Sequence, residues 1–87
     1  MESIGNWKVK SCEEFAYWTQ NLSQLDIRET DKGFRLRSTH DYTLRNKVVC
    51  GKMIDSRTLI GYYDSMDSAY KVAIEIMKAN PNGMPFN

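Results

Sequence analysis

The stretch LIGYYDSMDSAYKVAIEIMKANP, residues 59–81, predicts a strand that turns directly into a helix. Residues 58–63 are rich in β-branched and aromatic side chains, which favour a strand. Asp64 or Ser65 then provides a helix cap, and Asn80-Pro81 ends the helix. The apolar side chains between these limits recur at helical spacing and form one inward stripe: Met66, Ala69, Tyr70, Ala73, Ile76 and Met77. Lys71 and Glu75 lie four residues apart on the outer side.

The segment that precedes this junction by some forty residues predicts a second helix, over residues 12–24. Ser11 and Glu14 have the spacing of a capping box, in which each side chain satisfies a free backbone N–H group at the start of a helix. Four apolar residues follow at intervals of three and four and define a helical face: Phe15, Trp18, Leu22 and Leu25.

The residues between the two helices predict strands. Asp31-Lys32-Gly33 is a turn signal, and Phe34–Arg37 alternates apolar and basic side chains, as a strand with one buried face does. After a polar turn at 38–41, residues 42–54 predict a second strand, with Gly51 as a bulge. A short loop at 55–57 leads to the third strand.

These elements predict an α+β fold of order α-β-β-β-α, in which both helices pack on one face of a three-stranded antiparallel sheet. At 87 residues the chain has room for one domain, spanning 1–87, with an N-terminal segment at 1–10 and a short tail at 80–87. The other face of the sheet stays open to solvent or to a partner. A chain this small is also a candidate for homodimer formation.

Basic charge is concentrated in the middle of the chain. Residues 28–57 hold eight Lys or Arg and four Asp or Glu, a net charge of +4, although the whole chain carries only +1. In the Arg35-Leu36-Arg37 stretch, the two arginines point to the same side, away from the helices. We therefore predict a nucleic-acid-binding surface on the open sheet face, for RNA or single strands in particular. Its candidate residues are Arg35, Arg37, Tyr42, Arg45, Lys47, Lys52 and Arg57.

The strand-to-helix junction resembles two families of DNA-binding domain. In the plant AP2 domain and in the arm-binding domains of tyrosine integrases, the third strand ends in Gly-aromatic, a small or acidic cap follows, and an Ala-rich helix begins. The corresponding residues here are Gly61, Tyr62, Tyr63, Asp64, Ala69 and Ala73. With the leading helix included, the order also resembles the double-stranded-RNA-binding domain, although the Lys-Lys-x-Ala-Lys start of its last helix is absent. The resemblance covers about 45 residues, and in the DNA-binding families the exposed sheet face makes the contacts.

Two other functions remain open at this point. An open sheet face is equally suited to a protein partner, as in a small bacteriophage inhibitor of a host defence factor, toxin or nuclease. The small HicA-type endoribonucleases share the helix, three strands, helix order and use a histidine, for which His40 is the one candidate. Because no Ser-His-Asp set, carboxylate pair or Gly-rich phosphate loop can be placed, we expect a binding protein and no enzyme.

Cofactor and metal sites are not predicted. Cys12 and Cys50 are far apart in the sequence and belong to no Cys/His cluster, so we interpret both as small buried or half-buried hydrophobic residues. No apolar run approaches the ~18 residues that span a membrane, and no secretory signal opens the chain. We therefore expect a cytoplasmic protein.

Overall fold

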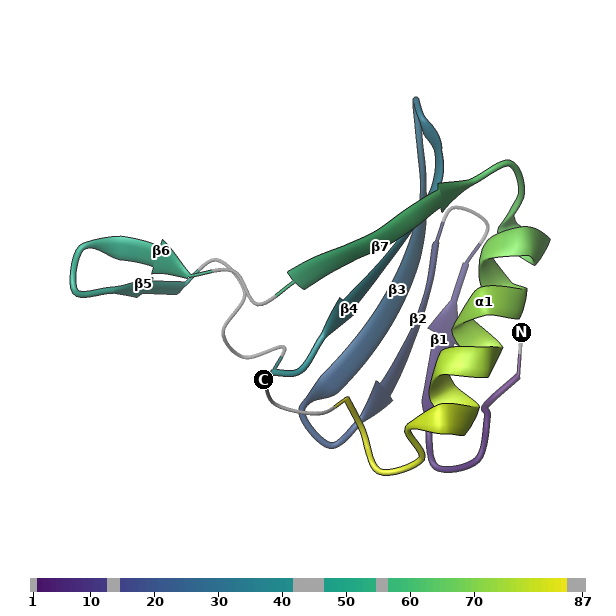
Figure 1. Cartoon of the computed structure of the whole chain (residues 1–87), viewed down its shortest axis with the longest axis horizontal. Coiled ribbons are helices and arrows are strands. Elements are labelled where there is room, and N and C mark those ends of the chain that lie inside the picture. Colours follow the sequence, from purple (N-terminus) through teal and green to yellow (C-terminus); the bar gives the residue numbers. More distant parts are fainter. Residues whose placement is uncertain (1, 13–14, 42–46, 55–56, 85–87) are drawn as a thin grey trace.

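The fold is a five-stranded antiparallel sheet with a single helix packed on one face (Figure 1). A computed structural model describes residues 2–12, 15–41, 47–54 and 57–84. The strand order in the sheet is β1-β2-β3-β4-β7, and every neighbouring pair is antiparallel. The bounds are β1 Lys8–Ser11, β2 Phe15–Gln20, β3 Ser23–Thr30, β4 Gly33–Thr39, β7 Arg57–Tyr63 and α1 Met66–Ala79. A separate two-stranded hairpin consists of β5 Lys47–Val49 and β6 Lys52–Ile54.

The predicted three-stranded sheet with two helices is wrong, because residues 15–24 of the segment predicted as a helix form β2, a two-residue turn and the start of β3. Aromatic and β-branched residues in β2 favour an extended chain, and the chain reverses at the two residues Asn21 and Leu22. Asn21 has the positive φ of 53° that such a turn requires. Ser11 ends β1, so the predicted capping box does not form.

The strand predicted at 58–63 and the helix that follows it are both confirmed. The strand β7 includes all of 58–63, and α1 begins after Ser65, whose hydroxyl accepts a hydrogen bond from the backbone N–H of Ser68 at 3.1 Å. The turn predicted at 31–33 is also present, as the connection between β3 and β4, and the strand predicted at 34–37 is part of β4. On the outer side of the helix, Lys71 pairs with Asp67 at 3.3 Å instead of Glu75.

The region 42–54 differs from the predicted single strand. Cys50 and Gly51 have positive φ angles of 52° and 76° and form the tight turn between β5 and β6, where a bulge was predicted. The one register shift lies instead in β7, opposite Leu36 and Arg37. Both cysteines are exposed, so their interpretation as buried residues was wrong.

The core lies between α1 and one face of the sheet. Its buried side chains come from β2, β3, β4 and α1 and from the segment before β1: Trp7, Ala16, Trp18, Leu25, Ile27, Leu36, Ala69, Ala73 and Met77. The Trp18 ring stacks on Tyr70 of the helix at a centroid distance of 5.5 Å. The indole N–H groups of Trp7 and Trp18 donate to the carbonyl oxygens of Asn80 and Glu2. These contacts hold the helix on one face of the sheet, and α1 does not cover the other face.

Candidate nucleic-acid interface on the open sheet face

The face opposite α1 consists of three rows of side chains that run across the strands. Side chains alternate between the two faces of a strand, so the pairing register assigns each residue to a face. The rows, read from β1 or β2 to β7, are Phe15–Arg28–Arg35–Tyr62, Lys10–Tyr17–Asp26–Arg37–Leu59 and Lys8–Thr19–Gln24–Thr39–Arg57. We call this surface the open face. Aromatic rings lie toward its β2 side, and arginines lie in its centre.

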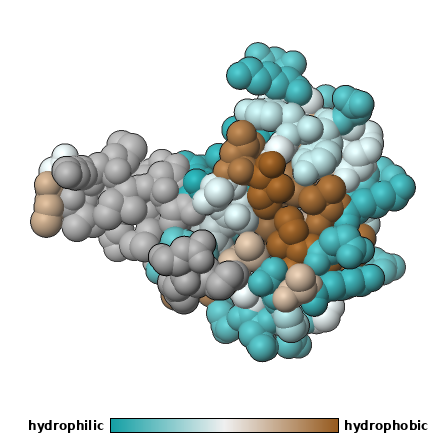
Figure 2. Space-filling model, in the orientation of Figure 1, coloured by the Kyte–Doolittle hydropathy of each residue, from teal (hydrophilic) through white to brown (hydrophobic). Residues whose placement is uncertain are grey.

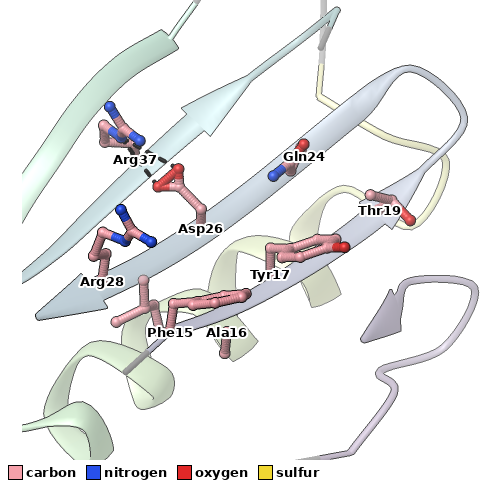
Figure 3. Close-up of a pocket in the computed structure, with 9 residues that line it drawn as sticks. Phe15, Ala16, Tyr17, Thr19, Gln24, Asp26, Arg28 and Arg37 are labelled. Atoms are coloured by element: carbon pink, nitrogen blue, oxygen red, sulfur yellow. Dashed lines mark hydrogen bonds and ion pairs between the residues drawn. The ribbon is translucent and has the colours of Figure 1, made fainter. Parts of the chain in front are cut away.

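Phe15 and Tyr17 form an aromatic pair on β2. Their ring centroids are 6.0 Å apart and their planes are inclined by only 10°, so the two half-buried rings are nearly parallel, and we call this pair the aromatic wall (Figure 3). The guanidinium carbon of Arg28 lies 5.5 Å from the centre of the Phe15 ring, within cation–π range. Flat aromatic surfaces beside a cation are what an unpaired nucleic-acid base stacks on.

A shallow depression of about 460 Å³ lies between this aromatic wall and the polar side chains of β3 and β4 (Figure 3). Its floor and walls include Thr19, Gln24, Asp26, Arg28 and Arg37. Arg37 donates through Nε to both carboxylate oxygens of Asp26, at 3.0 and 3.2 Å. This ion pair neutralises one of the arginines on the open face.

Arg28 and Arg35 lie directly opposite each other on neighbouring strands. Like charges in such a cross-strand pair repel each other. Among the described residues, neither arginine has an ion-pair partner, and the Nε of Arg35 is buried without a hydrogen-bond acceptor. A buried donor without a partner costs roughly 1–3 kcal/mol. A bound anion would screen the repulsion between the two guanidinium groups.

The structure brings together only part of the predicted site. Arg35 and Arg37 lie on the open face as predicted, and the register places Arg57 at its far corner, opposite Thr39. Tyr42 and Arg45 lie outside the described residues. Lys47 and Lys52 belong to the β5–β6 hairpin, which is not part of the five-stranded sheet.

The residues of the open face that the sequence prediction missed include Lys8, Lys10, Phe15, Tyr17 and Arg28. These five lie in or beside the segment that was assigned to a helix or left outside the elements. The run of aromatic and β-branched residues at 15–19 was the signal that could have found β2.

Other site types have little support in the described part of the chain. It holds no group of three or more His, Cys, Asp or Glu side chains that could bind a metal ion. His40 follows β4 at a bend, and its backbone oxygen accepts a hydrogen bond from the Ser23 hydroxyl at 3.5 Å. None of the helices described there is long and apolar enough to cross a membrane.

Comparisons with known proteins found no family model, no curated protein and no solved structure that matches this chain.

Proposed function

We propose that the protein binds single-stranded nucleic acid on the open face of its sheet. The observation that carries this proposal is the pair Arg28 and Arg35, two adjacent cations without a carboxylate partner, beside the stacked rings of Phe15 and Tyr17. Phosphate groups require such cations, and unpaired bases require such rings. The two features lie next to each other, as they do in each nucleotide of a single strand.

In the proposed complex, a phosphate lies between Arg28 and Arg35 and accepts hydrogen bonds from the terminal N–H groups of their guanidinium groups. The base enters the depression and stacks on the wall formed by Phe15 and Tyr17. Lys8 and Lys10, exposed on β1, extend the positive surface along the strand of nucleic acid.

RNA is favoured over DNA in this proposal. The hydroxyl of Thr19 and the amide of Gln24 line the depression beside the aromatic wall (Figure 3). Both groups can donate to and accept from a ribose 2′-OH, which DNA lacks. A duplex is a poorer fit, because its bases are already stacked on each other and cannot lie against Tyr17.

The test is fluorescence anisotropy with labelled single-stranded RNA, single-stranded DNA and duplex RNA of equal length, at about 50 and 150 mM salt. We expect saturable binding in the order single-stranded RNA, single-stranded DNA, duplex. The Arg28→Ala/Arg35→Ala variant should bind at least tenfold more weakly. The slope of log affinity against log salt should fall by roughly 1.4, for two lost contacts at about 0.7 each.

The matched control is Lys71→Ala/Lys78→Ala, which removes the same charge from the exposed side of α1. It should change affinity less than twofold. Equal losses in the two variants would mean that total charge, and not the open face, determines binding. Absence of binding at low salt would contradict the proposal and direct the search to a protein partner of the same face.

A further inference from the structure

The two edges of the sheet differ in how they are protected. An unpaired edge strand is a template for pairing with another chain, and proteins usually protect it with charged side chains. The strand β1 has the exposed lysines Lys8 and Lys10. The strand β7 has no charge between Thr58 and Tyr63 and exposes Leu59 (53%) and Tyr62 (42%). In the described part of the chain, only Leu22 is a further large hydrophobic residue so exposed.

The bulge in β7 places both of these side chains on the same face. Leu59 lies opposite Arg37, and Tyr62 lies opposite Arg35, although the two are three residues apart in the sequence. In a regular strand such residues would point to opposite faces. Thr58 and Tyr63 lie on the helix side, opposite Ser38 and Phe34.

With these face assignments, β7 can pair antiparallel with β7 of a second copy about a two-fold axis. In a two-fold pair, residues that oppose each other must point to the same face. Pairing Leu59 with Tyr62 of a second copy also pairs Thr58 with Tyr63 of that copy, and both pairs satisfy this condition. A register shifted by one residue, with Leu59 opposite Gly61, would place Arg57, Thr58 and Leu59 against residues of the other face.

We propose that a second copy of this chain pairs along β7, so that two five-stranded sheets join into one. Each exposed Leu59 then packs against the exposed Tyr62 of the other copy, twice across the two-fold axis. The same register places Arg57 opposite Asp64 of the other copy, so opposite charges meet at both ends of the paired strands.

An apolar patch beside the same edge fits this arrangement. On the helix side, brown atoms occupy the surface between β7 and α1 (Figure 2). Half-buried side chains that pack on the core from these elements and from β4 include Phe34, Ile60, Val72 and Ile76. A two-fold axis perpendicular to the joined sheet brings both helices to this side, so each copy covers part of the other's apolar surface.

The first test is sedimentation equilibrium of the intact chain. We expect a mass of 20.2 kDa, twice the 10.1 kDa of one copy. Leu59→Lys should raise the dimer dissociation constant at least tenfold. Leu22→Lys, which makes the same substitution at an exposed site in the β2–β3 turn, should leave it unchanged. A wild-type monomer at all accessible concentrations, or equal behaviour of the two folded variants, would overturn the proposal.

A second test fixes the register by disulfide cross-linking, which captures a dimer even where the substitutions weaken its equilibrium. In a Cys12→Ser/Cys50→Ser background, Leu59→Cys/Tyr62→Cys should give a covalent dimer on mild oxidation with copper phenanthroline. Leu59→Cys alone should not, because the two copies of residue 59 are separated along the paired strands. Equal cross-linking of both variants, or none in either, contradicts this register. The result is independent of nucleic-acid binding, because neither test contains nucleic acid.

Discussion

At the scale of single residues, two features of the open face lower the stability of the free protein. Arg28 and Arg35 oppose each other across β3 and β4, which costs about 0.2–1 kcal/mol. The unpartnered Nε of Arg35 adds roughly 1–3 kcal/mol. In the proposed complex, an anion between the two guanidinium groups would relieve the repulsion, so part of this free-energy cost would be recovered on binding.

This argument predicts that Arg35→Met stabilises the free protein while it weakens nucleic-acid binding. The methionine keeps the unbranched stem up to the position of Nε and removes the buried donor and the repulsion. We expect the free energy of unfolding in urea to rise by about 0.5–2 kcal/mol, because the costs above are lost. Affinity for single-stranded RNA should fall at least tenfold.

Lys78→Met is the control, because Lys78 is exposed in the last turn of α1. It should change both quantities little. A less stable Arg35→Met protein that binds RNA normally would contradict the role assigned to this arginine.

The aromatic wall predicts a second pair of variants. Tyr17→Leu keeps an apolar, half-buried side chain but removes the flat ring, so a base loses its stacking surface. We expect a loss of about 1–3 kcal/mol in binding free energy, as measured for other stacking aromatics. Tyr17→Phe retains the ring and should bind within threefold of the wild type. Anisotropy titrations decide between stacking and charge alone: similar affinities for the leucine and phenylalanine variants would exclude stacking on Tyr17.

At the scale of elements, the β3–β4 turn depends on one glycine. Gly33 has a φ of +112°, and a Cβ built there would lie 2.7 Å from the backbone oxygen of Tyr63 in β7. Gly33→Ala should therefore destabilise the fold by at least about 2 kcal/mol in urea unfolding, since strain and a backbone clash add. Gly51→Ala has a similar positive φ but open space around it, and should cost only about 1 kcal/mol. Equal costs would show that the approach of β7 to this turn is looser than described.

The hairpin of β2 and β3 explains why the element order could not be predicted. Phe15, Trp18, Leu22 and Leu25 recur at helical spacing, yet Leu22 belongs to a turn and Phe15 to the open face. A two-residue turn at Asn21-Leu22 lacks the glycine that usually marks a hairpin. The local sequence fits a helix and a strand almost equally well. Tertiary packing of Trp18 against Leu25 and Tyr70 favours the strand.

Residues of the candidate site could be assigned from the sequence only where the strand that carries them was itself predicted. The alternation at Phe34–Arg37 was clear, so Arg35 and Arg37 were assigned to the correct face. Arg37 was nevertheless taken as a free cation, because its partner Asp26 lies on β3, eleven residues away in a segment that was not recognised as a strand. Cross-strand partners become visible only when the register is known.

At the scale of the whole molecule, a nearly neutral chain presents a basic face. The net charge of +1 gives little long-range attraction for nucleic acid, so the proposed binding would depend on charge placed on one side. Trp18, Leu25, Ile27 and Leu36 fill the helix side of the sheet, which leaves the opposite side to polar and aromatic residues. Pairing along β7 would place two such faces side by side.

This charge distribution predicts that Asp26→Asn strengthens binding. The change releases Arg37 from its ion pair and adds one positive charge to the open face. We expect affinity for single-stranded RNA to rise about three- to tenfold and the salt slope to steepen by roughly 0.7, for one new phosphate contact. Asp67→Asn makes the same charge change on the outer side of α1 and should have little effect. Equal effects would indicate that net charge acts without regard to position.

The most direct measurement of the central claim is a map of the binding surface by ¹⁵N–¹H chemical-shift perturbation during titration with single-stranded RNA. We predict that the largest changes are at backbone amides of β2, β3 and β4 near Phe15, Tyr17, Arg28 and Arg35, and that they saturate together. The outer surface of α1 should be unchanged. Changes confined to α1, or none at all at millimolar RNA and low salt, would contradict the assignment of the open face as a nucleic-acid-binding surface.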